Sequence, residues 1–240
     1  MAKENSGWGY TRIQGALQNL GHRVARSTIA KVLKDNGIQP APSRPSSWRT
    51  FLRAHWGEIV GADFFTTEVW TPRGLKTYYV FFLIDLKSRR VCVAGATQNP
   101  NAGFMESVAR SLLASRSGFL RTKRFLILDR DGKYTAGFKS GLRSAGIQII
   151  QTPHRAPNCN AHAERFVRSI KDECLDRMVL FGEGHLSRAI DEYVAHYHRE
   201  RNHQGLGNDL IDSAPCAAGS EVQCAERLGG LLRFYHRAAA

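Results

Sequence analysis

The feature that most limits what this chain can fold into is a block of strand-like sequence that begins after Trp56. Three segments, at residues 59–70, 75–85 and 90–97, are rich in β-branched and aromatic residues, which favours successive strands. Short turn-forming sequences, PRG and KSR, separate them. The sequence therefore predicts an antiparallel meander of three strands.

The rest of this region alternates between helical and strand-like patterns. A seven-residue apolar run at 78–84 (YYVFFLI) predicts a buried central strand, and it is far shorter than the roughly 20 residues of a membrane span. Helices are expected near 101–115 and 136–145, strands at 124–128 and 147–151, and a long helix from about residue 160. The predicted fold class is α/β, with a mixed five-stranded sheet flanked by helices.

A separate helical module is expected before this domain. Residues 10–20 and 27–37 carry apolar residues at helical spacing, with Ser27 expected to cap the second helix and Gly37 to end it. The run QPAPSRPSS at 39–47 cannot continue a helix and indicates a linker. The expected divisions are a module at 1–38, a linker at 39–54, a core domain at 55–212 and a tail at 213–240 with an apolar helical stretch at 228–235.

The positive charge of the chain is concentrated in the N-terminal module. The chain has 34 Lys and Arg against 21 Asp and Glu, a formal charge of +13. Residues 1–55 carry nine basic and two acidic residues, whereas residues 56–212 carry 22 and 17. Two short helices joined by a tight basic turn are typical of a helix-turn-helix, whose second helix enters the major groove of DNA. The side chains expected to face DNA are Arg23, Arg26, Lys31 and Lys34. The alternative is a helical hairpin with a solvated basic face.

The five cysteines form no metal-binding or disulfide pattern. Their number is odd and no two form a C-x-x-C pair, which excludes a disulfide framework and zinc-finger spacing. The N-terminus has no apolar signal segment. We therefore expect a reduced cytoplasmic protein with ordinary thiols.

Three carboxylates occupy positions at which chemistry is expected. Asp63 lies inside an apolar strand, where an unpaired charge is costly. Asp129 follows the fourth strand, at the kind of strand end where open α/β sheets form ligand sites. Glu164 lies in the first turns of the long helix. If the three converge, their oxygen-only ligation suits Mg²⁺ or Mn²⁺ rather than zinc.

The sequence around these carboxylates resembles bacterial insertion-sequence transposases and retroviral-type integrases. Asp63 in ADFFT, Asp129 in LDRDGKY and Glu164 in PNCNAHAER match the Asp, Asp, Glu triad of their RNase H-like core. The 34 residues between Asp129 and Glu164 are close to the family's spacing. The segment YHRERNHQGL at 197–206 resembles the end of bacterial cores, and the N-terminal helices resemble the preceding helix-turn-helix. Because no His/Cys zinc module is present, the bacterial type is the closer match over roughly residues 8–210.

The resemblance implies a DDE-type polynucleotidyl transferase that cleaves DNA and joins the exposed 3′-OH to a new strand. It implies two metal ions, Mg²⁺ or Mn²⁺, with Asp63 bridging them and Asp129 and Glu164 each flanking one. The implied partners are double-stranded DNA, at element ends and target, and further copies of the chain in a homo-oligomer. The implied location is the bacterial cytoplasm, near the nucleoid and away from any membrane.

Two basic residues accompany Glu164 on the predicted helix. Arg168 and Lys171 lie at +4 and +7, so they share its face and are expected to hold phosphates beside the scissile bond. The alternative is ordinary surface charge that pairs with nearby acids.

Three further polar residues near the triad are expected to have supporting roles. Asp131 is expected to cap a turn rather than to replace Asp129, and Asp85 to cap the turn after its strand. His162 is expected to have a positioning or surface role, because a two-metal site does not require a general base.

Three other functions are compatible with parts of this pattern. A stand-alone RNase H-like nuclease would need no helix-turn-helix. The module begins abruptly, with Trp8 soon after Met1, whereas a helix-turn-helix usually packs on a third helix. A truncated or inactive transposase-derived DNA-binding protein is therefore the second alternative. The third is a structural protein with a basic surface, against which the three placed carboxylates argue.

Overall fold

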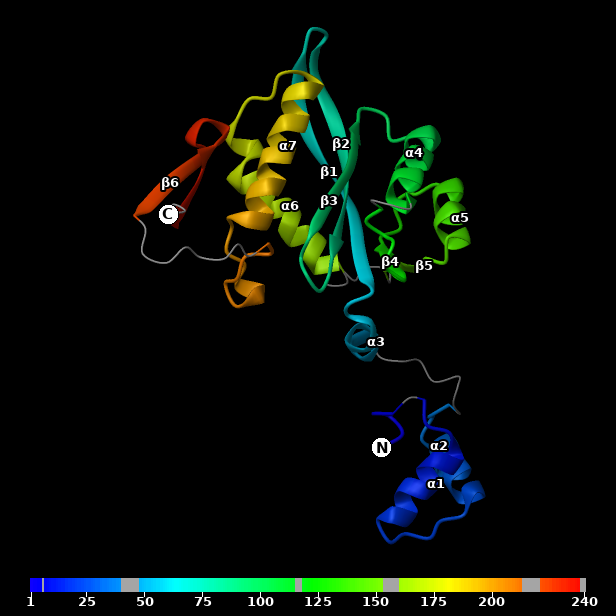
Figure 1. The fold of residues 1–240 in the computed structure, drawn as a ribbon. Coiled ribbons are helices and arrows are strands. Elements are labelled where there is room, and N and C mark those ends of the chain that lie inside the picture. The colour runs from blue at the N-terminus through cyan, green and yellow to red at the C-terminus, as the bar shows by residue number, and fades with distance from the viewer. Residues whose placement is uncertain (6, 40–47, 115–117, 153–159, 213–220, 238–240) are drawn as a thin grey trace. The chain divides into compact units, whose positions relative to one another are not determined.

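The structure of the 240-residue chain is a computed structural model that describes residues 1–5, 7–39, 48–114, 118–152, 160–212 and 221–237. The chain divides into two compact units, Met1–Trp56 and Gly57–Ala240 (Figure 1). Within the described ranges, no helix has both the length and the apolar character needed to cross a bilayer.

The first unit contains the two helices that the sequence predicts. Helix α1 (Tyr10–Asn19) and helix α2 (Arg26–Asp35) pack through a small apolar cluster centred on Ile13, Ile29 and Leu33. Gly37 follows α2 with a φ of 66°, a left-handed conformation that glycine adopts without strain. The expected cap was wrong, because Ser27 lies inside the helix and Ala25 occupies the N-cap position without a side-chain hydrogen bond.

A third helix lies in the range expected to be a linker. Helix α3 spans Trp48–His55, at the end of the first unit. The Pro- and Ser-rich residues 40–47 fall outside the described residues.

The second unit is built on a five-stranded sheet. Its strands are β1 (Ile59–Thr71), β2 (Gly74–Asp85), β3 (Val91–Thr97), β4 (Phe125–Leu128) and β5 (Gln148–Gln151). Their order is β3-β2-β1-β4-β5. Strands β1, β2 and β3 are antiparallel, whereas β4 pairs in parallel with both β1 and β5. The predicted antiparallel meander and the predicted mixed five-stranded sheet are therefore confirmed.

Helices cover both faces of this sheet (Figure 1). Their bounds are α4 (Ala102–Leu113), α5 (Ala136–Ser144), α6 (Ala161–Glu173) and α7 (Gly182–Arg199). Alternate residues of β1 face opposite sides, as a strand requires. Val60 and Ala62 pack in the cluster that contains α4 and α5 residues, whereas Phe65 and Val69 pack in the cluster of α6 and α7. Asp63 shares the alternation of Phe65 and therefore faces the α6 side.

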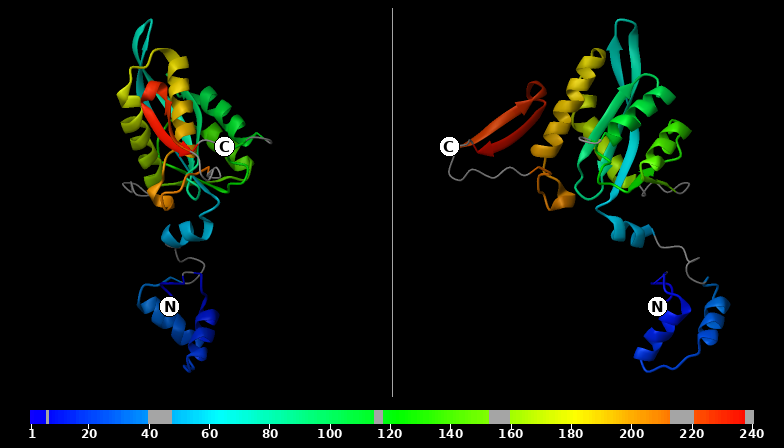
Figure 2. Two further views of the ribbon diagram at one scale, coloured as in Figure 1. Left: turned by 60° about the vertical axis from the view of Figure 1, so that its left-hand side comes forward. Right: turned by 45° about the vertical axis from the view of Figure 1, so that its right-hand side comes forward.

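The described part of the C-terminal tail, residues 221–237, forms a β-hairpin rather than the expected helical stretch. Strands β6 (Val222–Arg227) and β7 (Leu232–Arg237) pair antiparallel around a short turn. Gly229 and Gly230 both have positive φ there, which favours a turn over a helix. The hairpin lies beside α7 (Figure 2). Two ion pairs from Arg227, to Glu192 and Glu200, attach it to α7 and to the residue that follows α7.

Three short 3-10 segments lie among the later described elements, and one of them, η4 (Leu228–Gly230), forms the turn of the C-terminal hairpin. Segment η2 (Leu175–Arg177) follows α6, and η3 (Gln204–Leu206) follows α7. Of the five cysteines, Cys174 is buried, Cys92 is half-buried and Cys224 is exposed, and all three are free thiols. Cys159 and Cys216 lie outside the described residues.

Candidate active site

The strand register places Asp63 and Asp129 next to each other. Gly61 of β1 is paired with Ile127 of β4 in the parallel ladder. The ladder ends at this pair, and Asp63 and Asp129 each lie two residues further along the chain, close enough for the charge of Asp129 to raise the pKa of Asp63. Asp129 directly follows the last residue of β4, as the sequence predicts.

Helix α6 begins directly over this part of β1. Asn160, the residue before α6, donates from its side-chain amide to the carbonyl of Ala62 at 3.2 Å. Gly61 leaves room for this contact, because a Cβ at that position would lie 2.5 Å from Asn160 Oδ1. Glu164 lies in the first turn of α6, one turn after this anchor. The contact therefore fixes the helix start that carries Glu164 beside Asp63.

Replacing Gly61 by alanine should lower the free energy of unfolding by about 1 to 2 kcal/mol, because the new methyl group displaces Asn160 from its bond to Ala62. Urea unfolding of the full chain measures the change. Gly57→Ala is the matched control, since its Cβ would meet only Lys87 Cδ at an ordinary 3.6 Å. Equal stability of the two variants would contradict this role of Gly61.

The charge environment of Asp63 is acidic. The pKa of Asp63 is raised to about 6, chiefly by burial; the hydrogen bond from the Phe64 amide lowers it, and the charges of Asp129, Glu164 and Asp131 contribute to the rise. That amide donates to Asp63 Oδ1 at 2.8 Å. Asp63 therefore lies within electrostatic range of the other three carboxylates.

A buried tyrosine hydroxyl lies beside the same carboxylates. Tyr134 is only 2% exposed, and its Oη has no hydrogen-bond partner within the described part of the chain. Burial raises the pKa of Tyr134, as do the charges of Asp63, Asp129 and Asp131. A buried hydroxyl without a partner is unfavourable, so this group has unused capacity to bind a polar ligand at the acidic cluster.

Asp131 and Asp85 cap turns, as the sequence predicts. Asp131 accepts from the amide of Lys133 at 2.8 Å and also pairs with the ammonium group of Lys133, which holds the pKa of Asp131 below its ordinary range. Asp85 accepts from the amide of Lys87 at 2.9 Å and pairs with Lys123 at 2.6 Å. Both aspartates are therefore committed to partners within the protein.

The carboxylate side chains around Asp63 do not converge on one position in this structure. Within the described residues, no three Asp, Glu, His or Cys side chains are close enough to hold a metal ion between them. The donor set nevertheless fits a hard divalent cation, because it consists of carboxylate oxygens and a hydroxyl without a partner. The assignment of Asp63, Asp129 and Glu164 as catalytic metal ligands stays a prediction.

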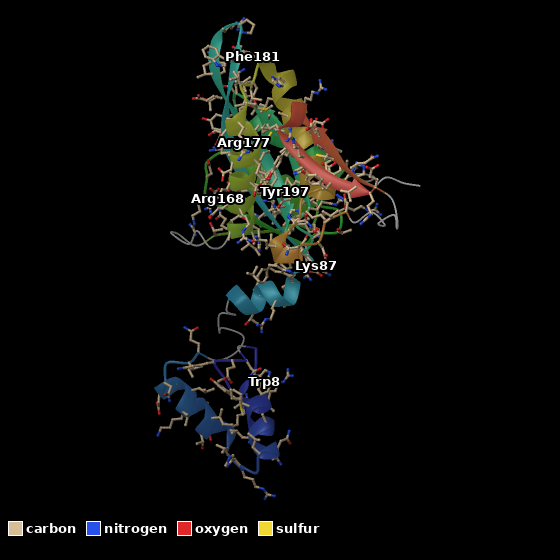
Figure 3. The ribbon with its side chains drawn as sticks, turned by 90° about the vertical axis from the view of Figure 1, so that its left-hand side faces the viewer. Trp8, Lys87, Arg168, Arg177, Phe181 and Tyr197 are labelled. Atoms are coloured by element: carbon tan, nitrogen blue, oxygen red, sulfur yellow. The ribbon has the colours of Figure 1, made fainter. Side chains whose placement is uncertain are left out.

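The two basic residues that follow Glu164 are both accessible. Arg168 is exposed at the edge of the unit, whereas Tyr197 lies inside it (Figure 3). Lys171 is half-buried and lines an open groove of about 630 Å³ beside Thr66 and Trp70 of β1. Within the described residues, neither Arg168 nor Lys171 forms an ion pair, and Glu68 and Asp176 also line the groove at Lys171.

The expected DNA-facing residues of the first unit are all exposed. Arg23 lies in the turn between α1 and α2, and Arg26, Lys31 and Lys34 lie on α2. Their contact with DNA stays a prediction. His162, near the start of α6, is half-buried, and burial with nearby arginines lowers its pKa to about 4.

Several residues around the carboxylates were missed by sequence reasoning. The contact between Asn160 and Gly61 joins residues that are far apart in the chain, and no local pattern indicates it. Tyr134 and Lys133 lie within the quoted motif LDRDGKY, which is the signal that would have identified them. Lys133 lies 5.5 Å from the ring centres of both Phe64 and Tyr79, at the border of the cluster.

A protein-family model matches part of the second unit. Residues 145–209 match the family described as an integrase core domain. The matched segment includes Glu164, Arg168 and Lys171 and ends after the YHRERNHQGL segment.

Solved structures with a similar chain trace include viral integrases and a transposase. The HTLV-2 integrase catalytic core domain, solved with magnesium, has 13% identity and a TM-score of 0.46, covering 65% of this chain and 93% of its own. The catalytic domain of Mos1 mariner transposase has 16% identity and a TM-score of 0.48, covering 61% and 74%. A simian T-cell lymphotropic virus intasome chain has 16% identity and a TM-score of 0.46, covering 99% and 86%.

Proposed function

We propose that this chain is a DNA transposase or integrase of the bacterial insertion-sequence type. It would cut DNA at the ends of a mobile element and join the exposed 3′-OH ends to a target. The observation that carries the proposal is the set of carboxylates around Asp63: Asp63 lies in β1, Asp129 follows the parallel strand β4, Glu164 lies in α6, and the charges of Asp129 and Glu164 raise the pKa of Asp63. The integrase core domain match over residues 145–209 supports the same class of reaction.

In this proposal Asp63, Asp129 and Glu164 hold two divalent cations, Mg²⁺ or Mn²⁺. When bound, such ions activate the attacking hydroxyl and stabilise the leaving oxygen of an in-line displacement. The fold of the chain positions the three carboxylates that would hold these ions. Asp63 is fixed by a central strand, Asp129 by the adjacent strand end, and Glu164 by a helix anchored through Asn160. Asp63 would bridge the two ions, and the other two carboxylates would each flank one.

The basic residues in this proposal bind and orient DNA. Arg168 and Lys171 lie on the same helix as Glu164 and would hold the phosphates beside the scissile bond. The exposed bases of the first unit, Arg23, Arg26, Lys31 and Lys34, would contact double-stranded DNA as a helix-turn-helix. Because two DNA ends must be brought together, we propose a homo-oligomer that acts in the bacterial cytoplasm.

A joining assay with the full chain tests this function. Labelled duplexes carrying the sequences that flank the gene should be nicked and joined in Mg²⁺ or Mn²⁺ and left intact in EDTA. A duplex with scrambled ends is the control for sequence recognition. Cleavage of an RNA–DNA hybrid without any joining would instead support a nuclease, and DNA binding without any cutting would support a non-catalytic derivative. Either result would contradict the proposal.

A further inference from the structure

A second cavity lies on a different side of α6 from Glu164. Its volume is about 220 Å³. Residues of α6 line one part of it, the end of β2 and the turn after β2 line a second, and the end of α7 with the segment that follows lines a third. This volume is well above the roughly 10–15 Å³ that one water molecule requires. Three arginines, Arg89, Arg165 and Arg201, line it, and no carboxylate is among its lining residues.

The three arginines are held in place by different contacts. Arg201 is fixed by Glu173, which accepts from its Nε at 2.9 Å and its Nη2 at 2.7 Å. Arg89 is half-buried and has a φ of 63°, an uncommon conformation for a residue other than glycine, and its Nη1 donates to the carbonyl of Leu86. Burial and the charge of Arg165 lower the pKa of Arg89. The guanidinium groups of Arg89 and Arg165 are thus close enough to repel one another.

The remaining polar groups of the cavity can donate hydrogen bonds without adding negative charge. The hydroxyls of Ser169 and Tyr197 line the cavity beside the imidazole of His162. Glu173 pairs with Arg201 from outside the cavity, and the lining that the structure describes contains three guanidinium groups and no carboxylate.

We propose that this arginine pocket binds a phosphate group of the DNA backbone. Planar guanidinium groups with neighbouring hydroxyls match the oxygens of a phosphate. Arg165 is the residue after Glu164, so it is about 100° further around α6 and at nearly the same height along the helix. A strand that reaches Glu164 therefore passes within reach of the pocket. This inference rests on the proposed function, because it assumes that DNA approaches this end of α6.

Thermal unfolding of the full chain tests the pocket itself. In EDTA and at constant ionic strength, replacing chloride by inorganic phosphate should raise the Tm in a saturable manner. Arg165→Gln, whose side chain is exposed, should lose this shift, and Arg89→Gln should lose it also. Arg110→Gln, at an exposed position of α4, is the matched control and should keep it. A phosphate shift that survives in both pocket variants would overturn the proposal.

Binding of a short duplex of arbitrary sequence distinguishes DNA phosphate from a free anion. Fluorescence anisotropy in EDTA should give about tenfold weaker binding for Arg165→Gln. The slope of log affinity against log salt should become shallower by about 0.9, because the variant neutralises one phosphate fewer. Unchanged duplex binding combined with loss of the phosphate shift would assign the pocket to a free anion and overturn its assignment to DNA. Neither measurement needs metal or joining, so a negative result here is distinct from failure of the joining assay.

Discussion

A chain in which Asp63 is replaced by asparagine should lose metal-dependent joining of DNA ends by a factor on the order of a thousand or more. Asparagine keeps the size of the side chain and can still accept from the Phe64 amide, but it cannot supply the charge that holds divalent cations. Joined product formed per unit time in Mg²⁺ measures the effect. Binding of the duplex should stay within a few-fold of the wild-type chain, because Asp63 is not a DNA contact.

The same substitution should make the metal-free protein more stable at pH 8. The pKa of Asp63 is about 6 in the folded chain and about 3.9 when unfolded, so the folded state disfavours the charged form. This cost is absent below pH 4, grows between pH 4 and 6, and is complete above pH 6. Its removal should raise the free energy of unfolding by up to about 2 to 3 kcal/mol at pH 8.

Asp131→Asn is the matched control for both effects. Its partner Lys133 holds the pKa of Asp131 below the ordinary value, so removing the carboxylate should lower stability rather than raise it. Joining should persist in this variant, which also separates Asp131 from Asp129 as the second carboxylate of the site. Full joining activity in Asp63→Asn would eliminate the proposed role of Asp63, whatever its effect on stability.

Strand periodicity and turn sequences predict the sheet well. The apolar run 78–84 and the turns on either side of its strand predict the bounds of β1, β2 and β3 to within one or two residues. Each of these strands is long and rich in β-branched and aromatic residues, so its own sequence indicates it. The prediction of a helical stretch in the tail was wrong because it relied on local spacing alone. The apolar residues at 228–235 fit a helix by spacing, but Gly229 and Gly230 with positive φ favour a turn, and the pairing of β6 with β7 is a contact that local spacing does not encode.

The positions of the carboxylates could be predicted, whereas their surroundings could not. Asp63 and Asp129 were identified because a charge inside an apolar strand and a charge at a strand end are both visible in a single sequence. The close approach of Asn160 to Gly61 depends on how α6 crosses β1, which is a tertiary contact. The arginine pocket joins residues from three separate parts of the chain, each of which is an ordinary surface base in its local context.

The chain should lose stability as the pH falls from 6.5 to 4, with His198 as a major cause. His198 is 8% exposed, and its Nε2 accepts from the Val91 amide at 2.9 Å, so the folded chain holds the neutral ring. Burial, followed by the charge of Arg90, lowers the pKa of His198 to about 4, against 6.5 in the unfolded chain. Because the unfolded state takes up the proton first, stability that is complete above pH 6.5 is lost as the pH falls toward 4, by about 3 kcal/mol.

His198→Gln isolates this contribution, because the glutamine Oε1 can accept from the Val91 amide but does not titrate. Urea unfolding at a series of pH values should give a difference, wild type minus variant, that falls by about 3 kcal/mol between pH 7.5 and pH 4. Taking the difference removes the opposite contribution of Asp63, which gains stability over part of the same range. His236→Gln, at an exposed position of β7, is the matched control. An NMR titration midpoint for His198 above 6.5 would reverse the sign and contradict the prediction, because a ring that gained its proton more readily in the folded state would stabilise the chain in acid.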